Sequence, residues 1–564
     1  MKRKALIGVS AALIWLSACG GEEASSPQDT APVAAEDNVL APESVGGLSP
    51  AEAIETHMAY LASDELEGRE AGSEGYEKAA AYTAAEFERL GLKPAGDQGT
   101  YFQTVPLARS YRVAEAGGMT VTMPDGETVD LEKNVDFAIG ASTRFESSSR
   151  EAGAVFVGYG IVAPDTGRDD YEGLDVEGKI VFMLSGTPSG IQTEERAYYG
   201  SRKTAEASAR GALGVVQLET PQRREIYSFK RLVGEGRLDS ARMSWTGSDG
   251  APFSRAPNVE VGATVSLEGA EKLFALTGTP YEAIIAASEA EGGQVEGFDL
   301  PFTVSITQES KIDTIESPNV IAMIEGSDPD LKAEVIVLTA HLDHIGISDS
   351  FAGDRINNGA LDNAAGVATL LEVARKMSEG EAPRRSVMFL LVTAEEKGLL
   401  GAQYFTENPT LDRERIVGNV NLDMPVLTYD FQDVVAFGSD RSNIADAVAS
   451  AAEEMGMTLS PDPFPEQGLF TRSDHFRFVE IGVPSVFLAT GFANGGEQAW
   501  NEHFAKNYHR PSDDMSNDLD FAAAARFAEV NYRIAMTLAN REERPLWKAG
   551  DFFARQFDGP MQAE

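Results

Sequence analysis

Three short apolar runs occur between residues 335 and 423, and each one ends at a polar residue. They are VIVLTA before His341, SVMFLLVTA before Glu395, and VGNVNL before Asp423. Apolar runs of this length that are rich in branched side chains predict buried strands. The polar residues are therefore expected at the ends of strands.

The segment 362–379 has a different period. Val367, Leu370, Leu371 and Ala374 recur at i, i+3, i+4 and i+7, which predicts a helix with one buried stripe. Strand, helix and strand in alternation predict an α/β fold whose mostly parallel sheet is flanked by helices. In such a sheet, ligands bind outside the carboxyl ends of the strands, so the terminal polar residues should converge there.

Candidate chemistry is concentrated at these positions. Imidazole nitrogen and carboxylate oxygen are zinc ligands, and two imidazoles with three carboxylates suffice for two ions if one carboxylate bridges. A further carboxylate nearby could carry a proton from water to a leaving amine. The adjacent Glu395 and Glu396 can supply one carboxylate that binds metal and one that carries the proton. The pattern indicates a two-metal hydrolase built from His341, Asp362, Glu395, Glu396, Asp423 and His509.

Six motifs, in this order along the chain, resemble the zinc aminopeptidase family that also contains glutamate carboxypeptidase, glutaminyl cyclase and transferrin receptor. The resemblance covers most of 50–130 and 310–545 and implies a di-zinc exopeptidase fold. The motifs are HLDH (341–344), GALDNAAGVATLLEVAR (359–375), TAEEKGLLGAQYF (393–405), NLDM (421–424), SDHFRF (473–478) and YHRPSDD (508–514).

The resemblance implies a role for each metal ligand. Asp362 would bridge two Zn²⁺ ions, with His341 and Asp423 completing one site and Glu396 and His509 the other. Sites of this composition also accept Co²⁺ or Mn²⁺.

The resemblance also implies the catalytic residues. Glu395 would be the general acid and base, and the carboxylate of Asp343 would orient the imidazole of His341. The bond from Asp362 to Asn363 is expected to be cis. Asp474 and His475 are expected to line the site or support its ligands, whereas His344 has no assigned slot.

The expected activity is that of an aminopeptidase acting on peptides. A carboxypeptidase or dipeptidase of the same family is the first alternative, because Arg472 and Arg510 flank the motifs and could clasp a terminal carboxylate. A non-catalytic binding protein is the second alternative, and the complete ligand set argues against it. Side-chain preference and oligomeric state are not indicated by the sequence.

The motifs are interrupted by a segment of different composition. Within it, 154–164, 169–184 and 203–219 resemble a protease-associated domain, with strand, strand, helix and strand expected in that order. The segment has no catalytic motif, and in relatives such an insert influences which substrates enter. We therefore expect a β-rich α+β domain inserted at 131–310 between two parts of the peptidase domain, 50–130 and 311–545, with a C-terminal tail at 546–564.

The first 19 residues resemble a bacterial lipoprotein signal. Lys2, Arg3 and Lys4 precede an apolar stretch, which ends in Leu-Ser-Ala before Cys19, the only cysteine in the chain. Lipid attached at Cys19 would be the only link to a membrane, through a disordered tether at 20–49. Gly20, where aspartate would favour inner-membrane retention, favours the outer membrane. The chain is thus expected in the bacterial cell envelope, at the outer membrane or on the periplasmic side.

Charge narrows the range of partners. With 89 acidic and 47 basic residues, the formal net charge is −42. Electrostatic repulsion therefore argues against nucleic acid and against anionic membrane surfaces as partners.

Overall fold

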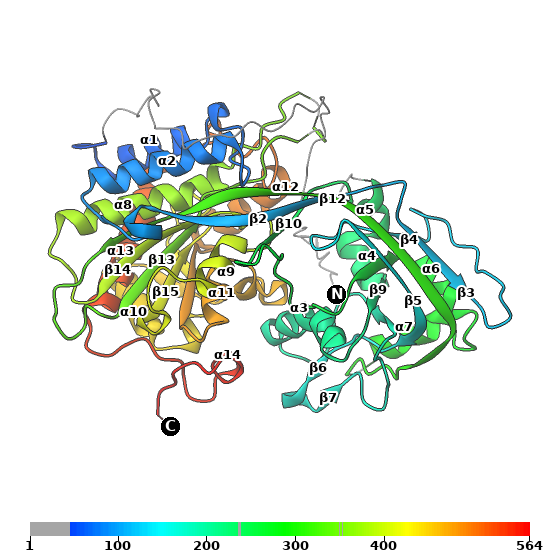
Figure 1. Ribbon diagram of the computed structural model, residues 1–564. Coiled ribbons are helices and arrows are strands. Elements are labelled where there is room, and N and C mark those ends of the chain that lie inside the picture. The colour runs from blue at the N-terminus through cyan, green and yellow to red at the C-terminus, as the bar shows by residue number, and fades with distance from the viewer. Residues whose placement is uncertain (1–44, 235–237, 291, 349, 352, 564) are drawn as a thin grey trace, which may run out of the picture. The chain divides into compact units, whose positions relative to one another are not determined.

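The computed structural model describes residues 45–563 except 235–237, 291, 349 and 352, and the chain forms two compact units (Figure 1). The first unit comprises Pro106–Ile315 and Phe464–Thr471. The second comprises 45–105, 316–463 and 472–563. The expected signal, with Cys19, and most of the expected tether lie outside the described residues. Within the described ranges, no helix combines the length and the apolar character needed to cross a membrane.

A mainly parallel sheet forms the centre of the second unit. Its strand order is β17–β16–β18–β15–β13–β14–β12, and the run from β18 to β14 is parallel throughout. The antiparallel pairs are β16 with β18 and β12 with β14. The predicted α/β class is confirmed. The strands are β12 (Phe298–Ile324), β13 (Val335–His341), β14 (Ser386–Val392), β15 (Ile416–Leu422), β16 (Asp433–Phe437), β17 (Thr458–Ser460) and β18 (Ser485–Thr490).

Helices cover both faces of this sheet because alternate strand residues point to opposite sides. Ile336 and Leu338 of β13 belong to one apolar core, and Val335 and Val337 belong to the other. The first core is shared with α1 (Pro50–Leu61), α2 (Glu74–Arg89), α8 (Ala365–Glu379), α10 (Ile444–Glu454) and α13 (Phe521–Asn540) (Figure 1). The second core includes residues of α9 (Leu400–Glu407) and α11 (His475–Val479). The remaining helices of this unit are α12 (Gly496–Lys506) and α14 (Phe552–Gln556).

Helix α8 begins later than the residue pattern predicts. The turn Ala360–Ala364 precedes it, and Asp362 and Asn363 have non-helical backbone angles there. The peptide bond between these two residues is cis, as expected. The helix therefore starts at Ala365 rather than at Asp362.

The first unit contains its own parallel strands, β5 (Ser147–Phe156), β8 (Ile180–Leu184), β9 (Gly214–Leu218) and β11 (Val261–Val265). Helix α3 (Thr193–Ala209) connects β8 to β9, so the expected strand, strand, helix, strand order is present. The unit begins at Pro106, before the expected insert at 131–310, because β2 (Phe102–Arg112) pairs with β10 (Arg242–Trp245) and β3 (Gly118–Thr122) pairs with β12. The other elements of this unit are β4 (Phe137–Ala138), β6 (Val162–Ala163), β7 (Arg168–Asp169), α4 (Pro221–Tyr227), α5 (Phe229–Gly234), α6 (Leu267–Phe274) and α7 (Tyr281–Glu289).

Candidate metal centre

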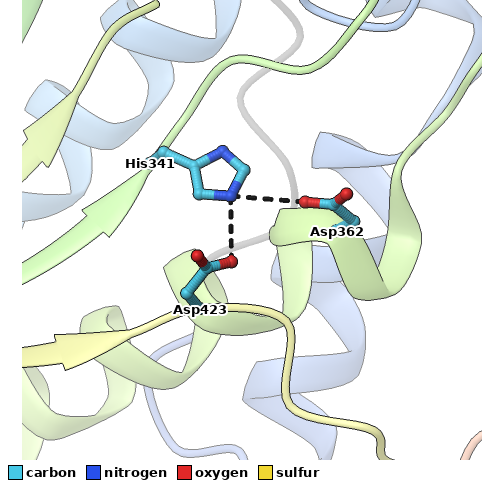
Figure 2. Close-up of side chains that lie close together, drawn as sticks. All are labelled: His341, Asp362 and Asp423. Atoms are coloured by element: carbon cyan, nitrogen blue, oxygen red, sulfur yellow. Dashed lines mark hydrogen bonds and ion pairs between the residues drawn. The ribbon is translucent and has the colours of Figure 1, made fainter. Parts of the chain in front are cut away.

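Three candidate ligands meet at the carboxyl ends of β13 and β15. His341 is the last residue of β13, and Asp423 follows β15 directly. Nε2 of His341 lies 3.1 Å from Oδ1 of Asp423 and 3.3 Å from Oδ1 of Asp362, which comes from the turn before α8 (Figure 2). The side chains are largely buried, so their polar atoms face one another rather than bulk water.

The other oxygen of Asp362 faces a second group. Nε2 of His509 lies 3.2 Å from Oδ2 of Asp362 and 3.3 Å from Oε2 of Glu396, which follows β14. Asp362 thus presents one oxygen to each imidazole, the arrangement that a bridging carboxylate requires. The structure brings together all five ligands expected from the sequence.

The spacing of these atoms fits bound metal. Nitrogen and oxygen donors about 2.0–2.2 Å from a tetrahedral zinc lie about 3.3–3.6 Å from one another. The nitrogen–oxygen separations of 3.1–3.3 Å are close to that range. Because the donors are imidazoles and carboxylates, the set suits Zn²⁺, Co²⁺ or Mn²⁺.

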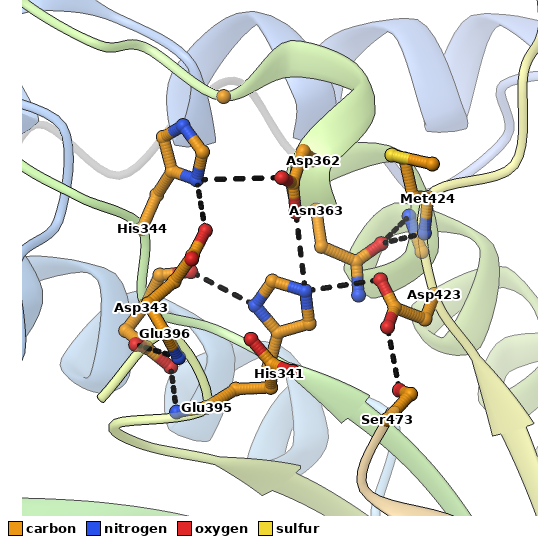
Figure 3. Close-up of polar contacts among 12 residues, drawn as sticks. His341, Asp343, His344, Asp362, Asn363, Glu395, Glu396, Asp423, Met424 and Ser473 are labelled. Carbon is orange, nitrogen blue, oxygen red and sulfur yellow. Dashed lines mark hydrogen bonds and ion pairs between the residues drawn. The ribbon is translucent and has the colours of Figure 1, made fainter. Parts of the chain in front are cut away.

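His344, to which the sequence analysis assigned no role, also lies in the centre. Its Nδ1 is 2.8 Å from Oε1 of Glu396 and 3.9 Å from Oδ2 of Asp362 (Figure 3). His344, Asp362 and Glu396 form a second group with ligand atoms close enough for one ion. The sequence evidence for a role of His344 was its position three residues after His341 in the same motif.

The contact made by Asp343 differs from the expected one. Nδ1 of His341 lies 3.0 Å from the backbone carbonyl of Asp343, not from its carboxylate. The carboxylate instead accepts hydrogen bonds from the backbone N–H groups of Glu395 (3.0 Å) and Glu396 (3.3 Å) (Figure 3). Because these two N–H groups follow β14, the side chain of Asp343 fixes the turn that carries both glutamates.

Two further side chains hold the backbone around Asp362. Asp513 accepts hydrogen bonds from the N–H groups of Leu361 and Asp362. Asn363 donates to the carbonyl of Leu422 (3.0 Å) and accepts from the N–H of Met424 (3.1 Å) (Figure 3). Asn363 therefore links the turn before α8 to the segment that carries Asp423.

A chain of hydrogen bonds orients Asp423. Ser473 donates to Oδ2 of Asp423 at 2.5 Å, and Asn421 donates to the hydroxyl of Ser473 at 2.7 Å. Thr339 on β13 donates in turn to Asn421 at 2.6 Å. Asp423 thereby keeps Oδ1 directed at His341.

Arg69 ties the N-terminal part of the unit to the centre. Its buried guanidinium donates to the carbonyls of Leu342 (3.0 Å), Asn358 (2.7 Å) and Gly359 (3.1 Å). These carbonyls flank the segments that carry His341 and Asp362. Burial lowers the pKa of Arg69 to about 10, and the nearby carboxylates partly oppose that shift.

Charge–charge contacts shift the pKa values of the candidate ligands. Burial lowers the pKa of His509, but Glu396 and Asp362 outweigh it and bring the pKa to about 10. Burial opposes ionisation of Glu396, yet His509 and His344 lower the pKa of Glu396 to about 2. Metal ions would compete with protons for these imidazoles, since ligating histidine must be neutral.

Glu395 differs from the candidate ligands. Within the described part of the chain, its carboxylate makes no hydrogen bond or ion pair. Burial raises the pKa of Glu395 well above its ordinary value, His341 opposes this shift, and Glu396 adds to it. A half-buried carboxylate beside the candidate ligands, with no hydrogen-bond partner among the described residues, suits a general acid and base.

The remaining candidates lie near the centre in different ways. Asp474 is buried, neither carboxylate oxygen has a hydrogen-bond partner among the described residues, and burial raises the pKa of Asp474 to about 8. The ring of His475 is buried and lies 5.6 Å from that of Phe487. Arg472 is half-buried and electrostatically coupled to Tyr508, whose ring stacks on His509 at 3.9 Å, whereas Arg510 is exposed.

Comparisons with known proteins identify a family match, curated relatives and a similar solved structure. Residues 319–535 match the model of Peptidase family M28, a range that includes every candidate metal ligand. The chain is 26% identical over 360 residues to "probable leucine aminopeptidase 2" of Aspergillus oryzae, covering 61% of this chain and 59% of that protein. It is 28% identical over 278 residues to "Probable lipoprotein aminopeptidase LpqL" of Mycobacterium tuberculosis, covering 45% and 51%. The chain thus spans between half and three-fifths of these curated relatives.

A solved structure shows a broader but weaker similarity. The "Aminopeptidase from Aneurinibacillus sp. strain AM-1" has a TM-score of 0.48 and 20% sequence identity. The match covers 87% of this chain and 95% of that one.

Proposed function

We propose that this protein is a metal-dependent exopeptidase, specifically an aminopeptidase with two Zn²⁺ ions. The observation that carries the proposal is the shared carboxylate of Asp362, whose two oxygens face His341 and His509. Asp423 and Glu396 complete the two groups. The match of residues 319–535 to Peptidase family M28 supports the same conclusion.

Glu395 is the proton carrier in this proposal. Bound metal ions would polarise the scissile carbonyl and make a water molecule more acidic. Glu395 takes a proton from that water and later donates it to the departing peptide nitrogen. Its carboxylate is not engaged by another described side chain, which leaves it available for both transfers.

Attack at the amino end is supported by the relatives, two of which are described as aminopeptidases. A carboxypeptidase would instead need a cation for the terminal carboxylate, and the half-buried Arg472 is the residue available near Tyr508. Peptides that differ only in their termini separate these functions.

The test uses zinc-loaded protein and peptides with free, amino-blocked or carboxyl-blocked ends, with products identified by mass spectrometry. We expect loss of single residues from the amino end, abolished by acetylation of that end and by a chelator. Cleavage that requires a free carboxyl end would assign a carboxypeptidase. No cleavage of any peptide would leave a binding protein as the better description.

We also propose that the chain is a lipoprotein of the bacterial cell envelope, anchored through Cys19. The signal-like sequence 1–19 supports this, and a relative is described as a probable lipoprotein aminopeptidase. Cells grown with radiolabelled palmitate should incorporate label into the protein, and Cys19→Ser should not. Equal labelling of both forms would contradict the anchor.

The segment 131–310 is proposed to act as a protease-associated domain that restricts substrate entry. The order β5, β8, α3, β9 supports this assignment. A binding protein raised against the exposed residues of α3 should lower kcat/KM for long peptides more than for single-residue anilides. Equal effects on both substrates would argue against a gating role.

A further inference from the structure

The first unit contains a cavity of about 480 Å³ that is separate from the candidate metal centre. Strands β9 and β11 form one wall, and α4, α5, the loop 140–144 and residues of other segments, among them Arg242, also line the cavity. Its volume lies within the range of about 300–1,000 Å³ that is usual for small-molecule sites. Apolar side chains such as Val261 and Leu238 line it together with polar ones such as Gln217.

Arg242, the first residue of β10, lines this cavity without a partner. None of the described residues forms an ion pair with Arg242 or accepts a hydrogen bond from its guanidinium. The neighbouring residues Ala241 and Met243 are buried, whereas Arg242 is exposed.

The guanidinium lies against a well-anchored loop. A Cβ atom at Gly140 would lie 3.0 Å from Nη2 of Arg242, so the absent side chain leaves room for the guanidinium. The buried amide of Gln308 donates to the carbonyl of Gly140 at 2.6 Å, and the N–H of Ser142 donates to Ser310 at 2.8 Å. These contacts fix the wall on which Arg242 rests.

The acidic residues in the cavity wall are engaged elsewhere. Glu219 pairs with Arg224 at 2.8 Å and accepts hydrogen bonds from the N–H groups of Phe229 and Leu267. Glu260 pairs with Arg150. A second cation, Arg223, also lines the cavity. Among the described residues neither Arg223 nor Arg242 forms an ion pair, in a chain whose formal net charge is −42.

We propose that this cavity binds a small organic carboxylate that carries an apolar group, with Arg242 as the residue that contacts the carboxylate. Planar guanidinium groups hold carboxylates through paired N–H donors. The apolar part of the ligand would pack against Leu232 and Val259, which line the cavity and are half-buried.

A singly charged ligand fits better than a phosphate. Glu219 and Glu260 stay close to the cavity even though both are paired, and their charge would oppose a dianion more than a monoanion. The proposal concerns the first unit alone and does not depend on peptidase activity.

Isothermal titration calorimetry on the metal-loaded protein tests this, with 3-phenylpropanoate, its neutral amide and inorganic phosphate as probes. We expect 3-phenylpropanoate to bind at least tenfold more tightly than the amide or phosphate. Arg242→Gln should weaken its binding at least tenfold, whereas Arg109→Gln, a change on β2 outside the cavity, should not. Carboxylate bound at the metal centre would be recognised because it would survive Arg242→Gln.

A pair of variants at Gln217 separates a loss of binding from a loss of folding. The side chain of Gln217 is exposed to the cavity, so Gln217→Trp should fill the space and abolish binding, while Gln217→Ala should retain it. Unchanged affinity in both Arg242→Gln and Gln217→Trp would overturn the proposal. Phosphate that binds more tightly than 3-phenylpropanoate, and through Arg242, would overturn the carboxylate assignment. So would the absence of 3-phenylpropanoate binding up to about 10 mM, which corresponds to a binding free energy weaker than about −3 kcal/mol.

Discussion

The carboxylate of Asp513 accepts a hydrogen bond from the backbone N–H of Asp362 at 3.0 Å, and its other oxygen accepts one from Leu361 at 3.1 Å. Asp513 is fully buried and four residues after His509. The segment 509–513 therefore supplies the candidate ligand His509 and also fixes the backbone of Asp362, whose carboxylate faces both His341 and His509.

Replacing Asp513 with asparagine should weaken metal binding without unfolding the protein. The amide keeps one acceptor but turns an N–H group towards one of the two backbone N–H donors, so Asp362 loses part of its support. Loss of such supporting contacts lowers metal affinity by about 10- to 100-fold. Competition with a fluorescent zinc chelator measures the change. Asp514→Asn is the matched control, and equal affinities for the two variants would contradict the role given to Asp513.

Replacing Glu395 with glutamine should remove turnover but not metal. The amide cannot accept the proton from water, and general acid–base catalysis contributes about 10²–10⁴-fold. We expect kcat to fall by at least about 10²-fold, while elemental analysis still finds two ions per chain. Glu407→Gln, on the exposed end of α9, serves as the control. Near-normal kcat in Glu395→Gln would assign the proton transfers to another group.

The stability of the first unit should rise with pH because of Lys203. This buried amine donates to the carbonyls of Leu184 (2.5 Å) and Gly186 (2.9 Å), and burial lowers the pKa of Lys203 to about 7. In the unfolded chain the pKa is about 10.4. At a pH between these two pKa values, Lys203 is protonated in the unfolded state and largely neutral in the folded state, so the free energy of unfolding increases as pH rises. Below pH 7 Lys203 is protonated in both states, and its contribution to the free energy of unfolding is constant.

The variant Lys203→Met lacks this titration. Between pH 7 and 9, the wild-type free energy of unfolding should rise by up to about 1.4 kcal/mol per pH unit more than that of the variant. Urea unfolding followed by signals of the first unit measures both slopes. Lys179→Met, which alters a lysine paired with Asp299 at 3.0 Å, should keep the wild-type slope. Identical slopes for Lys203→Met and wild type would rule out the buried titration.

The residues at strand ends were the easiest part of the centre to predict. The runs before His341 and Asp423 are mostly apolar because β13 and β15 are buried on both faces, although Thr339 in β13 and Asn421 in β15 are polar. The first ionisable residue after each run lies at the end of the strand. The convergence of these ends follows from the parallel sheet. Assignment of individual roles required the resemblance, since periodicity does not distinguish Glu395 from Glu396.

The supporting contacts were not predictable in the same way. The His341 ring meets the carbonyl of Asp343, and Asp513 meets two N–H groups before α8; both contacts involve backbone atoms, which every residue carries. The start of α8 was missed for a related reason. Its apolar period extends back towards Asp362, but the backbone there leaves helical geometry to place the carboxylate.

The two histidines near Glu396 should have different roles. Nδ1 of His344 lies 2.8 Å from Oε1 of Glu396, and Nε2 of His509 lies 3.3 Å from Oε2. His509 also lies close to Asp362, at 3.2 Å, whereas His344 is 3.9 Å away. We infer that His509 is the ligand and that His344 holds Glu396 in position by donating a hydrogen bond.

Alanine variants of these histidines separate the roles. His509→Ala should retain only one ion per chain after dialysis against weak chelator. His344→Ala should retain two, with the affinity of the second about 10- to 100-fold lower. Zinc titration of the metal-free proteins measures both quantities. If His344→Ala instead holds one ion and His509→Ala holds two, the imidazole of His344 is the ligand and that of His509 the supporting group.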